Sequence, residues 1–118
     1  HDFYMSCRQR GFLIVGAKHH LLDHSLGHAT LHRLLGKRVI CSNHSALRRY
    51  YMTRNRLEVY WRYAAFEPKW CVMGTWRLLI GSVILLVFEV DGRNKLRAML
   101  KGAWHFVTRQ FGRLDSFP

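Results

Sequence analysis

Acidic residues are scarce in this sequence. Seven Asp and Glu stand against 19 Lys and Arg, which gives a formal net charge of +12. A field this positive attracts phosphates, nucleic acid or anionic lipid headgroups, and the charge alone does not choose among them. The composition therefore indicates an anionic partner without naming its class.

Cysteine is also rare, and its positions form no motif. Cys7, Cys41 and Cys71 lie far apart and include no Cys-x-x-Cys pair. This spacing argues against a disulfide framework and against a zinc ribbon. Reduced thiols in a protein that faces the cytosol are the simpler interpretation.

The sequence begins with His1 rather than Met, and its first residues have no signal-peptide pattern and no N-cap. They resemble the middle of an amphipathic segment. We therefore expect a fragment of a longer protein. A long apolar run is missing as well: Arg77 interrupts residues 70–90, and the run that remains, residues 78–88, is too short to cross a bilayer. We expect a buried or interfacial helix over residues 70–90.

Local patterns predict mixed structure in the first part of the chain and helices alone after Pro68. Glycines punctuate the first part, and short apolar runs of strand length lie between them. From these patterns we expect a helix at residues 2–10 that stops at Gly11, a buried strand at 12–15, a short strand at 20–24, a short helical piece before Gly36 and a strand at 38–41.

A long helix is predicted from about Leu47 to Phe66, because Pro68 prevents its continuation. On this helix the apolar spacing places Arg54 within a buried stripe, where an apolar side chain is normal. A cation at such a position requires an anion. The other members of the stripe are Leu47, Tyr50, Tyr51, Leu57 and Trp61, and the possible N-caps are Ser42, Asn43 and Ser45.

A last helix is predicted after Asp91 and Gly92, which break the chain or cap the helix. Its apolar stripe consists of Leu96, Met99, Leu100, Ala103, Trp104, Val107 and Phe111. Its other face carries Arg93, Lys95, Arg97, Lys101, Arg109 and Arg113 and no acid. Such a face is most often soluble surface, yet cations beside a Trp and Phe stripe also fit a helix that lies on anionic lipid. We expect the membrane-facing residues to be Trp76, Arg77, Lys101 and Trp104.

Four blocks of the sequence resemble family-two glycosyltransferases of the rhamnosyltransferase type in their order and spacing. Arg-Arg-Tyr-Tyr-x-x-Arg-Asn is the more specific pattern, and the likeness spans most of residues 1–113. One departure is Ala46, where the family usually has Pro. The blocks are His1-Asp2-Phe3 with Arg8-Gln9-Arg10-Gly11-Phe12, then His24-Ser25-Leu26-Gly27, then His44-Ser45-Ala46-Leu47-Arg48-Arg49-Tyr50-Tyr51, and Arg54-Asn55.

This resemblance implies the C-terminal part of a GT-A fold, whose nucleotide-binding half precedes the residues present here. The expected class is an α/β fragment that is mainly α overall. Residues 1–43, with a short helix and edge strands, would close the catalytic domain. Residues 44–118, with about three helices, would form an extension that faces the acceptor and the membrane.

The resemblance also implies roles for individual residues in an inverting sugar transfer. Asp2 would be the general base that takes the proton from the acceptor hydroxyl. His24 would complete the site of a magnesium or manganese ion, held mainly by an upstream Asp-x-Asp that this sequence lacks. The residues expected to contact the diphosphate are Arg48, Arg49, Tyr50, Tyr51, Arg54 and Asn55.

The implied enzyme moves a sugar, with rhamnose expected, from a nucleotide-sugar donor to a lipid-linked or cell-wall glycan. We expect it at the cytoplasmic face of the inner membrane as a peripheral protein. The fragment alone should be inactive, because the nucleotide pocket and the main metal ligands belong to the upstream half.

Each of these residues also has an ordinary structural interpretation. Asp2 fits a solvated acid in the first turn of a helix, and Tyr50 and Tyr51 fit a core. Arg48 and Arg49, like Arg56, fit a solvated basic face.

His24 fits a loop or core position as well as a metal site. It is one of four histidines spaced every four residues, with His20, His28 and His32. Gly27 argues against the continuous helix that would align them as zinc ligands.

Two other functions remain open. Arginines interleaved with aromatic residues also suit a module that binds nucleic acid, although such a module leaves the apolar residues 70–90 unexplained. A membrane-surface module without catalysis is the other alternative. The four blocks favour the transferase, so nucleic acid is not the expected partner.

Overall fold

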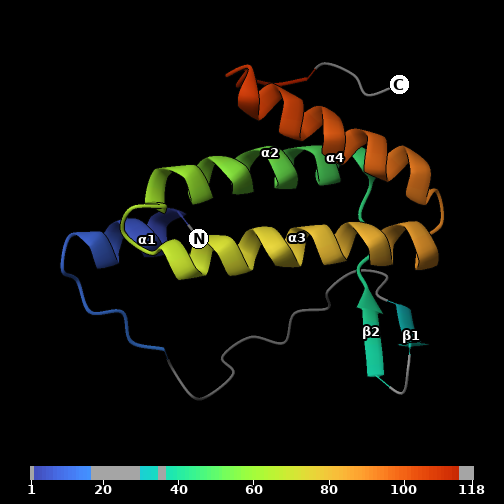
Figure 1. Cartoon of the computed structure of the whole chain (residues 1–118), viewed down its shortest axis with the longest axis horizontal. Coiled ribbons are helices and arrows are strands. Elements are labelled where there is room, and N and C mark those ends of the chain that lie inside the picture. The colour runs from blue at the N-terminus through green and yellow to red at the C-terminus, as the bar shows by residue number, and fades with distance from the viewer. Residues whose placement is uncertain (1, 17–29, 35–36, 115–118) are drawn as a thin grey trace.

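The computed structural model describes residues 2–16, 30–34 and 37–114 (Figure 1). Over these residues the chain is mainly helical, as expected from the sequence. The elements are α1 (Asp2–Gln9), β1 (Thr30–Leu34), β2 (Lys37–Cys41), α2 (Ala46–Tyr63), α3 (Pro68–Phe88) and α4 (Gly92–Val107).

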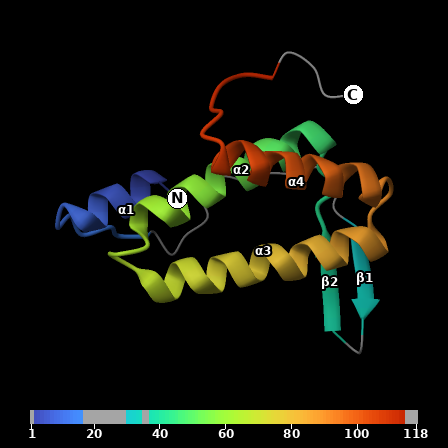
Figure 2. The same ribbon diagram turned by 45° about the horizontal axis from the view of Figure 1, so that its top comes forward.

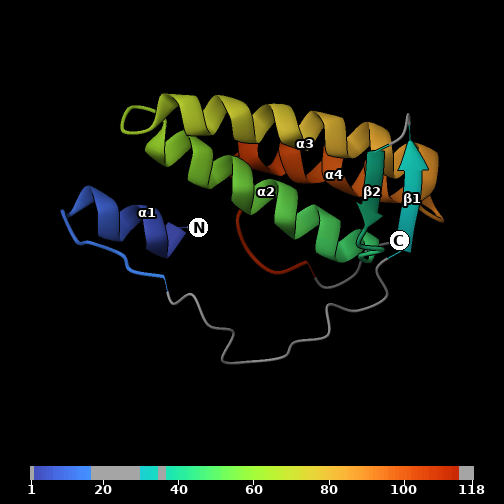
Figure 3. The same cartoon turned by 90° about the horizontal axis from the view of Figure 1, so that it is seen from below.

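Three long helices make up the body of the molecule. The most extensive packing is between α2 and α4, and α3 contacts both of these helices. The short helix α1 lies near the connection between α2 and α3, whereas the two strands lie at the other end of the body (Figure 3). Figure 2 shows α4 running along α2, with α3 beneath them.

Local sequence explains where α2 begins and ends. Of the three predicted caps, Ser45 is the N-cap, and its side chain accepts a hydrogen bond from the backbone N–H of Arg48 over 3.3 Å. The helix ends at Tyr63, and Pro68 is the first residue of α3. Proline suits that first helical position, where no backbone donor is needed. The predicted break at Pro68 is confirmed, although the same residue also starts the next helix.

The backbones of α2 and α4 approach each other closely at Gly102. A Cβ atom at this position would lie 2.6 Å from the carbonyl oxygen of Tyr50 and 3.4 Å from the backbone nitrogen of Arg54. The first distance is far below a van der Waals contact, so a side chain at position 102 would push the two helices apart. Tyr50 on α2 and Ala98 on α4, one turn before Gly102, are both fully buried.

The two strands form an antiparallel hairpin in which Thr30 pairs with Cys41 and Leu34 with Lys37. The strand predicted at 38–41 is therefore confirmed. The short helical piece predicted before Gly36 is wrong, because residues 30–34 pair as β1. Backbone pairing with β2 satisfies their hydrogen bonds and overrides the local helical pattern.

The buried strand predicted at residues 12–15 is also wrong. These residues follow α1, which ends near Gly11 as expected, but they form no regular structure, and Leu13 and Val15 are 89% and 81% exposed. No strand among the described residues pairs with them, so these apolar residues do not form part of a sheet. The strand predicted at 20–24 lies outside the described residues.

On α4 the buried stripe is rotated from the predicted one. Lys95, expected on the basic outer face, is 7% exposed, while Trp104 and Val107 of the predicted stripe are 64% and 68% exposed. Of the predicted stripe Met99 is buried, while Leu96 and Ala103 are half-buried. The buried residues of α4 are Gly92, Lys95, Ala98, Met99 and Gly102, so small residues and a paired lysine join Met99 on the packed face.

The helix predicted over residues 70–90 is confirmed as α3, which is mostly exposed, so of the two predicted settings the buried one is wrong and the interfacial one stays a prediction. Only 17% of its most apolar stretch is buried. The helix has 21 residues with a mean hydropathy of 2.0 over that stretch, so by length and composition it is able to cross a membrane. The apolar run 78–88 alone is too short to cross a bilayer. That limit does not apply to α3, because Arg77 lies within one continuous helix.

Replacing Gly102 tests the close crossing. We expect Gly102→Ala to lower the free energy of unfolding by about 2 kcal/mol, because its methyl group would clash with the backbone of α2. The matched control is Gly81→Ala in α3, where a Cβ meets nothing within 4 Å. That change should stabilise the protein by roughly 0.5–1 kcal/mol through helix propensity. Urea unfolding followed by circular dichroism measures both values, and equal effects would contradict the crossing.

Candidate functional site

Arg54 is buried at the α2–α4 crossing, as its place in the apolar stripe predicted. It is 6% exposed, and its guanidinium carbon lies 5.4, 5.1 and 5.4 Å from the ring centres of Tyr50, Tyr51 and Phe111. Stacking on aromatic faces suits the flat guanidinium group. The sequence pattern therefore located a buried cation correctly.

The hydrogen-bond partners of Arg54 are all neutral. It donates from Nη1 to the Gly112 carbonyl oxygen over 2.9 Å and to the Tyr50 hydroxyl over 3.3 Å, and from Nε to Asn55 Oδ1 over 3.2 Å. Among the described residues no carboxylate lies within ion-pair distance of it. The anion that a buried cation calls for is thus not supplied by this part of the chain.

Tyr50 and Tyr51 lie in different surroundings although they are adjacent. The fully buried Tyr50 has its hydroxyl 2.7 Å from His105 Nδ1 on α4. Tyr51 is half-buried, and its hydroxyl accepts a hydrogen bond from the backbone N–H of Leu114 over 2.7 Å. Tyr50 is therefore a core residue, and Tyr51 is hydrogen-bonded to the segment that follows α4.

Arg49 points into a buried ionic network on the other side of α2. The carboxylate of Glu89, with a side chain 2% exposed, accepts hydrogen bonds from Arg49 Nη2 at one oxygen and from Lys95 Nζ at 2.9 Å at the other. Ser42 Oγ accepts a further bond from Arg49 over 3.2 Å. Arg49, expected to contact diphosphate, is thus engaged in the ion pair that joins α2 to the start of α4.

The network affects two neighbouring titratable groups. Burial raises the pKa of the Cys41 thiol, and the negative charge of Glu89 raises it further. Burial also lowers the pKa of His44, and the adjacent Arg48 and Arg49 lower it further. Both shifts favour the uncharged forms, the thiol of Cys41 and the neutral imidazole of His44.

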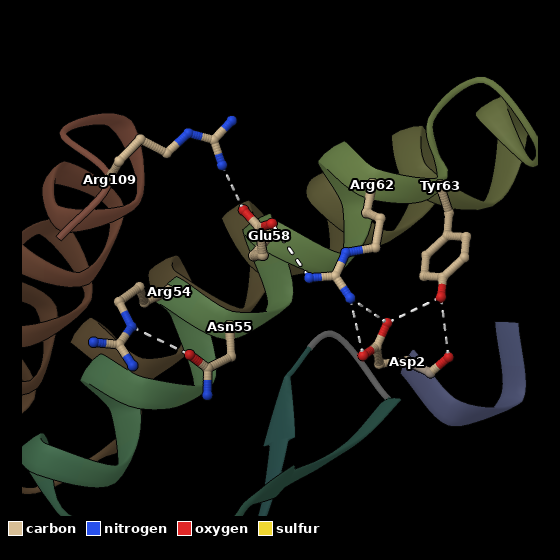
Figure 4. A network of polar contacts seen from close by, with 7 residues as sticks. All are labelled: Asp2, Arg54, Asn55, Glu58, Arg62, Tyr63 and Arg109. Carbon is tan, nitrogen blue, oxygen red and sulfur yellow. Dashed lines mark hydrogen bonds and ion pairs between the residues drawn. The ribbon is translucent and has the colours of Figure 1, made fainter. Parts of the chain in front are cut away.

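Asp2 sits at the start of α1 and is held by two residues near the end of α2 (Figure 4). Its carboxylate accepts hydrogen bonds from Arg62 Nη1 at 3.2 and 3.3 Å and from the Tyr63 hydroxyl at 3.0 Å. The side chains of Asp2 and Arg62 are 51% and 54% exposed. Asp2 is thus oriented but open to solvent.

A cavity of about 260 Å³ joins Asp2 to the middle of α2. Asn55 and Arg56 line it beside Asp2, and Tyr60 and Trp70 form part of its aromatic wall. Asp2 and Asn55, both selected from the sequence, therefore share one cavity. Arg54 lines a separate cavity, to which neither Asp2 nor Asn55 contributes, so Arg54 and Asp2 do not share a site.

Arg48 belongs to a third environment. It is exposed and lines an open hollow of about 410 Å³ together with Tyr51 and Asn55. The residues expected to contact a diphosphate are therefore spread over three faces of α2. Arg48 and Asn55 are accessible, Arg54 is covered and Arg49 is internally paired.

The remaining candidates lie on α3 and α4 or outside the described residues. Trp76, Arg77 and Trp104 are exposed on α3 and α4, and Lys101 is half-buried. His24 lies outside the described residues. Among residues 2–16, 30–34 and 37–114, no group of three His, Cys, Asp or Glu side chains is arranged to hold a metal.

Sequence reasoning missed several residues that organise the site. Glu58 pairs with Arg62 at 3.5 Å and with Arg109 at 2.7 Å, which links the tail of α4 to the support of Asp2 (Figure 4). The i,i+4 spacing of Glu58 and Arg62 was a visible signal. Glu89 and His105 gave no such signal, because their partners come from distant parts of the chain.

Comparison of the chain with protein-family models, with curated proteins and with solved structures found no match.

Replacing Glu89 tests the buried network. We expect Glu89→Gln to lower the free energy of unfolding by about 3 kcal/mol, because it leaves the charges of Arg49 and Lys95 buried without a counter-ion. The matched control is Glu58→Gln, whose arginine partners are about half exposed, and whose effect should stay within about 1 kcal/mol. Urea unfolding monitored by tryptophan fluorescence gives both values. A Glu89 effect no larger than the Glu58 effect would show that the network is not buried.

Proposed function

We propose that this chain is the C-terminal, acceptor-side part of an inverting glycosyltransferase with a GT-A catalytic domain. It would act with a nucleotide-sugar donor, with rhamnose the expected sugar, on a lipid-linked or cell-wall glycan. The observation that carries the proposal is that Asp2 and Asn55, from two separate blocks of the resemblance, line the same cavity.

In this proposal Asp2 is the catalytic base. Arg62 and the Tyr63 hydroxyl orient its carboxylate at the edge of the cavity, where an acceptor hydroxyl would approach. The aromatic wall formed by Tyr60 and Trp70, whose rings meet edge to face at 5.1 Å, suits the apolar face of a sugar ring. The carboxylate takes the hydroxyl proton as the acceptor oxygen attacks the anomeric carbon and the diphosphate of the donor departs.

The basic helix α2 would provide phosphate contacts beside that cavity. Arg48 and Asn55 are accessible for this role, and Arg54 becomes available if its cover moves. A divalent ion, magnesium or manganese, would neutralise the departing diphosphate when it is bound. Its ligands would come mainly from an upstream Asp-x-Asp, with His24 as a further proposed ligand.

The exposure of α3 supports a peripheral place on the inner face of the membrane. Val72, Trp76, Leu79 and Val83 recur at spacings of three and four residues and are 56–70% exposed, which gives α3 an apolar stripe. Cations occur along this part of the sequence, with Lys69 in the first turn of α3, Arg77 next to Trp76 and Arg93 at the start of α4, and they would meet anionic headgroups. The same stripe favours the second candidate function, a membrane-surface module without catalysis.

The test is sugar transfer by the chain joined to its upstream half. We expect Asp2→Asn to lower the transfer rate by about 100-fold or more, the contribution typical of a general base. Folding should change little, because the ion pair that Asp2 makes is exposed. The matched control is Asp91→Asn, an exposed acid at the start of α4, which should transfer at the wild-type rate. Wild-type activity in Asp2→Asn would exclude Asp2 as the base, and no transfer by the wild type would favour the module without catalysis.

A further inference from the structure

The chain turns back sharply at the end of α4. Thr108 is the C-cap, and Arg109 follows with a φ of 56°. The backbone N–H of Gln110 donates to the His105 carbonyl over 2.8 Å, and that of Arg109 donates to the Phe106 carbonyl over 3.2 Å. These two bonds are the Schellman pattern, which normally places Gly in the left-handed position. The turn directs residues 109–114, here called the C-terminal strap, back over α2.

A side chain at position 109 has a use that glycine lacks. The Arg109 guanidinium pairs with Glu58 at 2.7 Å and lies 5.9 Å from the ring centre of Trp61 and 5.4 Å from that of Phe106. A left-handed conformation costs a residue with a Cβ roughly 1 kcal/mol. These contacts offset that cost and fix the base of the C-terminal strap to α2.

Beyond its base, the strap covers Arg54 and Tyr51. The Gly112 carbonyl oxygen accepts a hydrogen bond from Arg54, the Leu114 N–H donates to the Tyr51 hydroxyl, and the Phe111 ring stacks near the Arg54 guanidinium. Figure 1 shows this last segment leaving α4. Two of these three contacts involve Arg54, and the hydrogen bond among them is accepted by a neutral backbone carbonyl.

Space for an anion lies under the strap. A cavity of about 170 Å³ is lined by Tyr50, Arg54 and His105 from the helices and by residues 110–114 from the strap. This volume is several times the roughly 30 Å³ that a water molecule occupies. Among the described residues the lining contains two guanidinium groups, those of Arg54 and Arg113, with an imidazole and a phenol, and no carboxylate. Its charge therefore matches an oxyanion.

We propose that the C-terminal strap is a reversible cover, and that an oxygen of a diphosphate replaces the Gly112 carbonyl on Arg54. A guanidinium meets an ionised phosphate through hydrogen bonds between opposite charges that are frequently bidentate, whereas the Gly112 carbonyl offers it one uncharged acceptor, so the exchange favours the anion. Arg113 and His105 would then contact the other oxygens. This inference rests on the proposed function for the identity of the anion, since the diphosphate would be that of its substrate.

A cover that competes with the ligand lowers the apparent affinity. The observed dissociation constant is the intrinsic one divided by the fraction of molecules in which the strap is open. A change that weakens the strap without touching Arg54 should therefore tighten binding. Gly112 offers this change, because its φ of 151° is strained for any residue with a Cβ, while a Cβ there meets nothing within 4 Å.

The experiment is a titration of the 118-residue chain with inorganic pyrophosphate and, separately, with orthophosphate, followed by NMR or calorimetry. We expect Gly112→Ala to bind pyrophosphate about threefold to tenfold more tightly. Arg54→Gln should bind it about tenfold or more weakly. The matched control, Arg97→Gln, removes the same charge from the exposed face of α4 and should change affinity far less. If Arg54→Gln fails to fold, Gly112→Ala and His105→Gln carry the test.

The outcomes separate the two proposals. Unchanged or weaker binding by Gly112→Ala would overturn the strap as a competitor. Equal losses in Arg54→Gln and Arg97→Gln would show only a general attraction to positive charge, and orthophosphate binding as tightly as pyrophosphate would overturn the diphosphate assignment. Because the titration requires no sugar transfer, it can succeed even where Asp2→Asn shows that Asp2 is not the base.

Discussion

The approach of α2 and α4 at Gly102 is the contact on which the rest of the structure depends. Backbone meets backbone there, because the carbonyl oxygen of Tyr50 occupies the space that a side chain at position 102 would need. This closeness buries Tyr50 completely and brings its hydroxyl to His105. It also encloses Arg54 one turn later on α2. The position of the buried cation thus follows from the absence of a side chain on the opposite helix.

The Arg-Tyr motif on α2 serves several environments. Arg49 joins the Glu89 network, which fixes α2 to the start of α4, whereas Arg54 lies among aromatic rings under the C-terminal strap. Asn55 accepts a hydrogen bond from Arg54 and also lines the cavity of Asp2. Successive residues of a helix point about 100° apart, so a compact sequence motif is necessarily spread around the helix. In this fold Asn55 lines both the cavity of Asp2 and the hollow beside Arg48, and its side chain is hydrogen-bonded to Arg54.

The sequence predicted those features that depend on local chemistry. The break at Pro68, a cap among Ser42, Asn43 and Ser45, the helix α4 after Asp91 and the burial of Arg54 are all properties of spacing or of one residue's geometry. The strand at 12–15 failed because a strand needs a partner, and apolar spacing does not supply one. Lys95 was placed on the outer face because its partner, Glu89, lies before the turn into α4. The cavity of Asp2 was beyond sequence reasoning alone, since residues from α1, α2 and α3 meet there only in the fold.

The α2–α4 crossing and the C-terminal strap together keep the Arg54 guanidinium out of water. The most direct measurement is the exchange rate of arginine Nε–H protons with solvent, observed by NMR on the wild-type chain. Because Arg54 donates from Nε to Asn55 and is 6% exposed, its Nε–H should exchange much more slowly than that of the exposed Arg48. Equal exchange rates for Arg54 and Arg48 would contradict the claim.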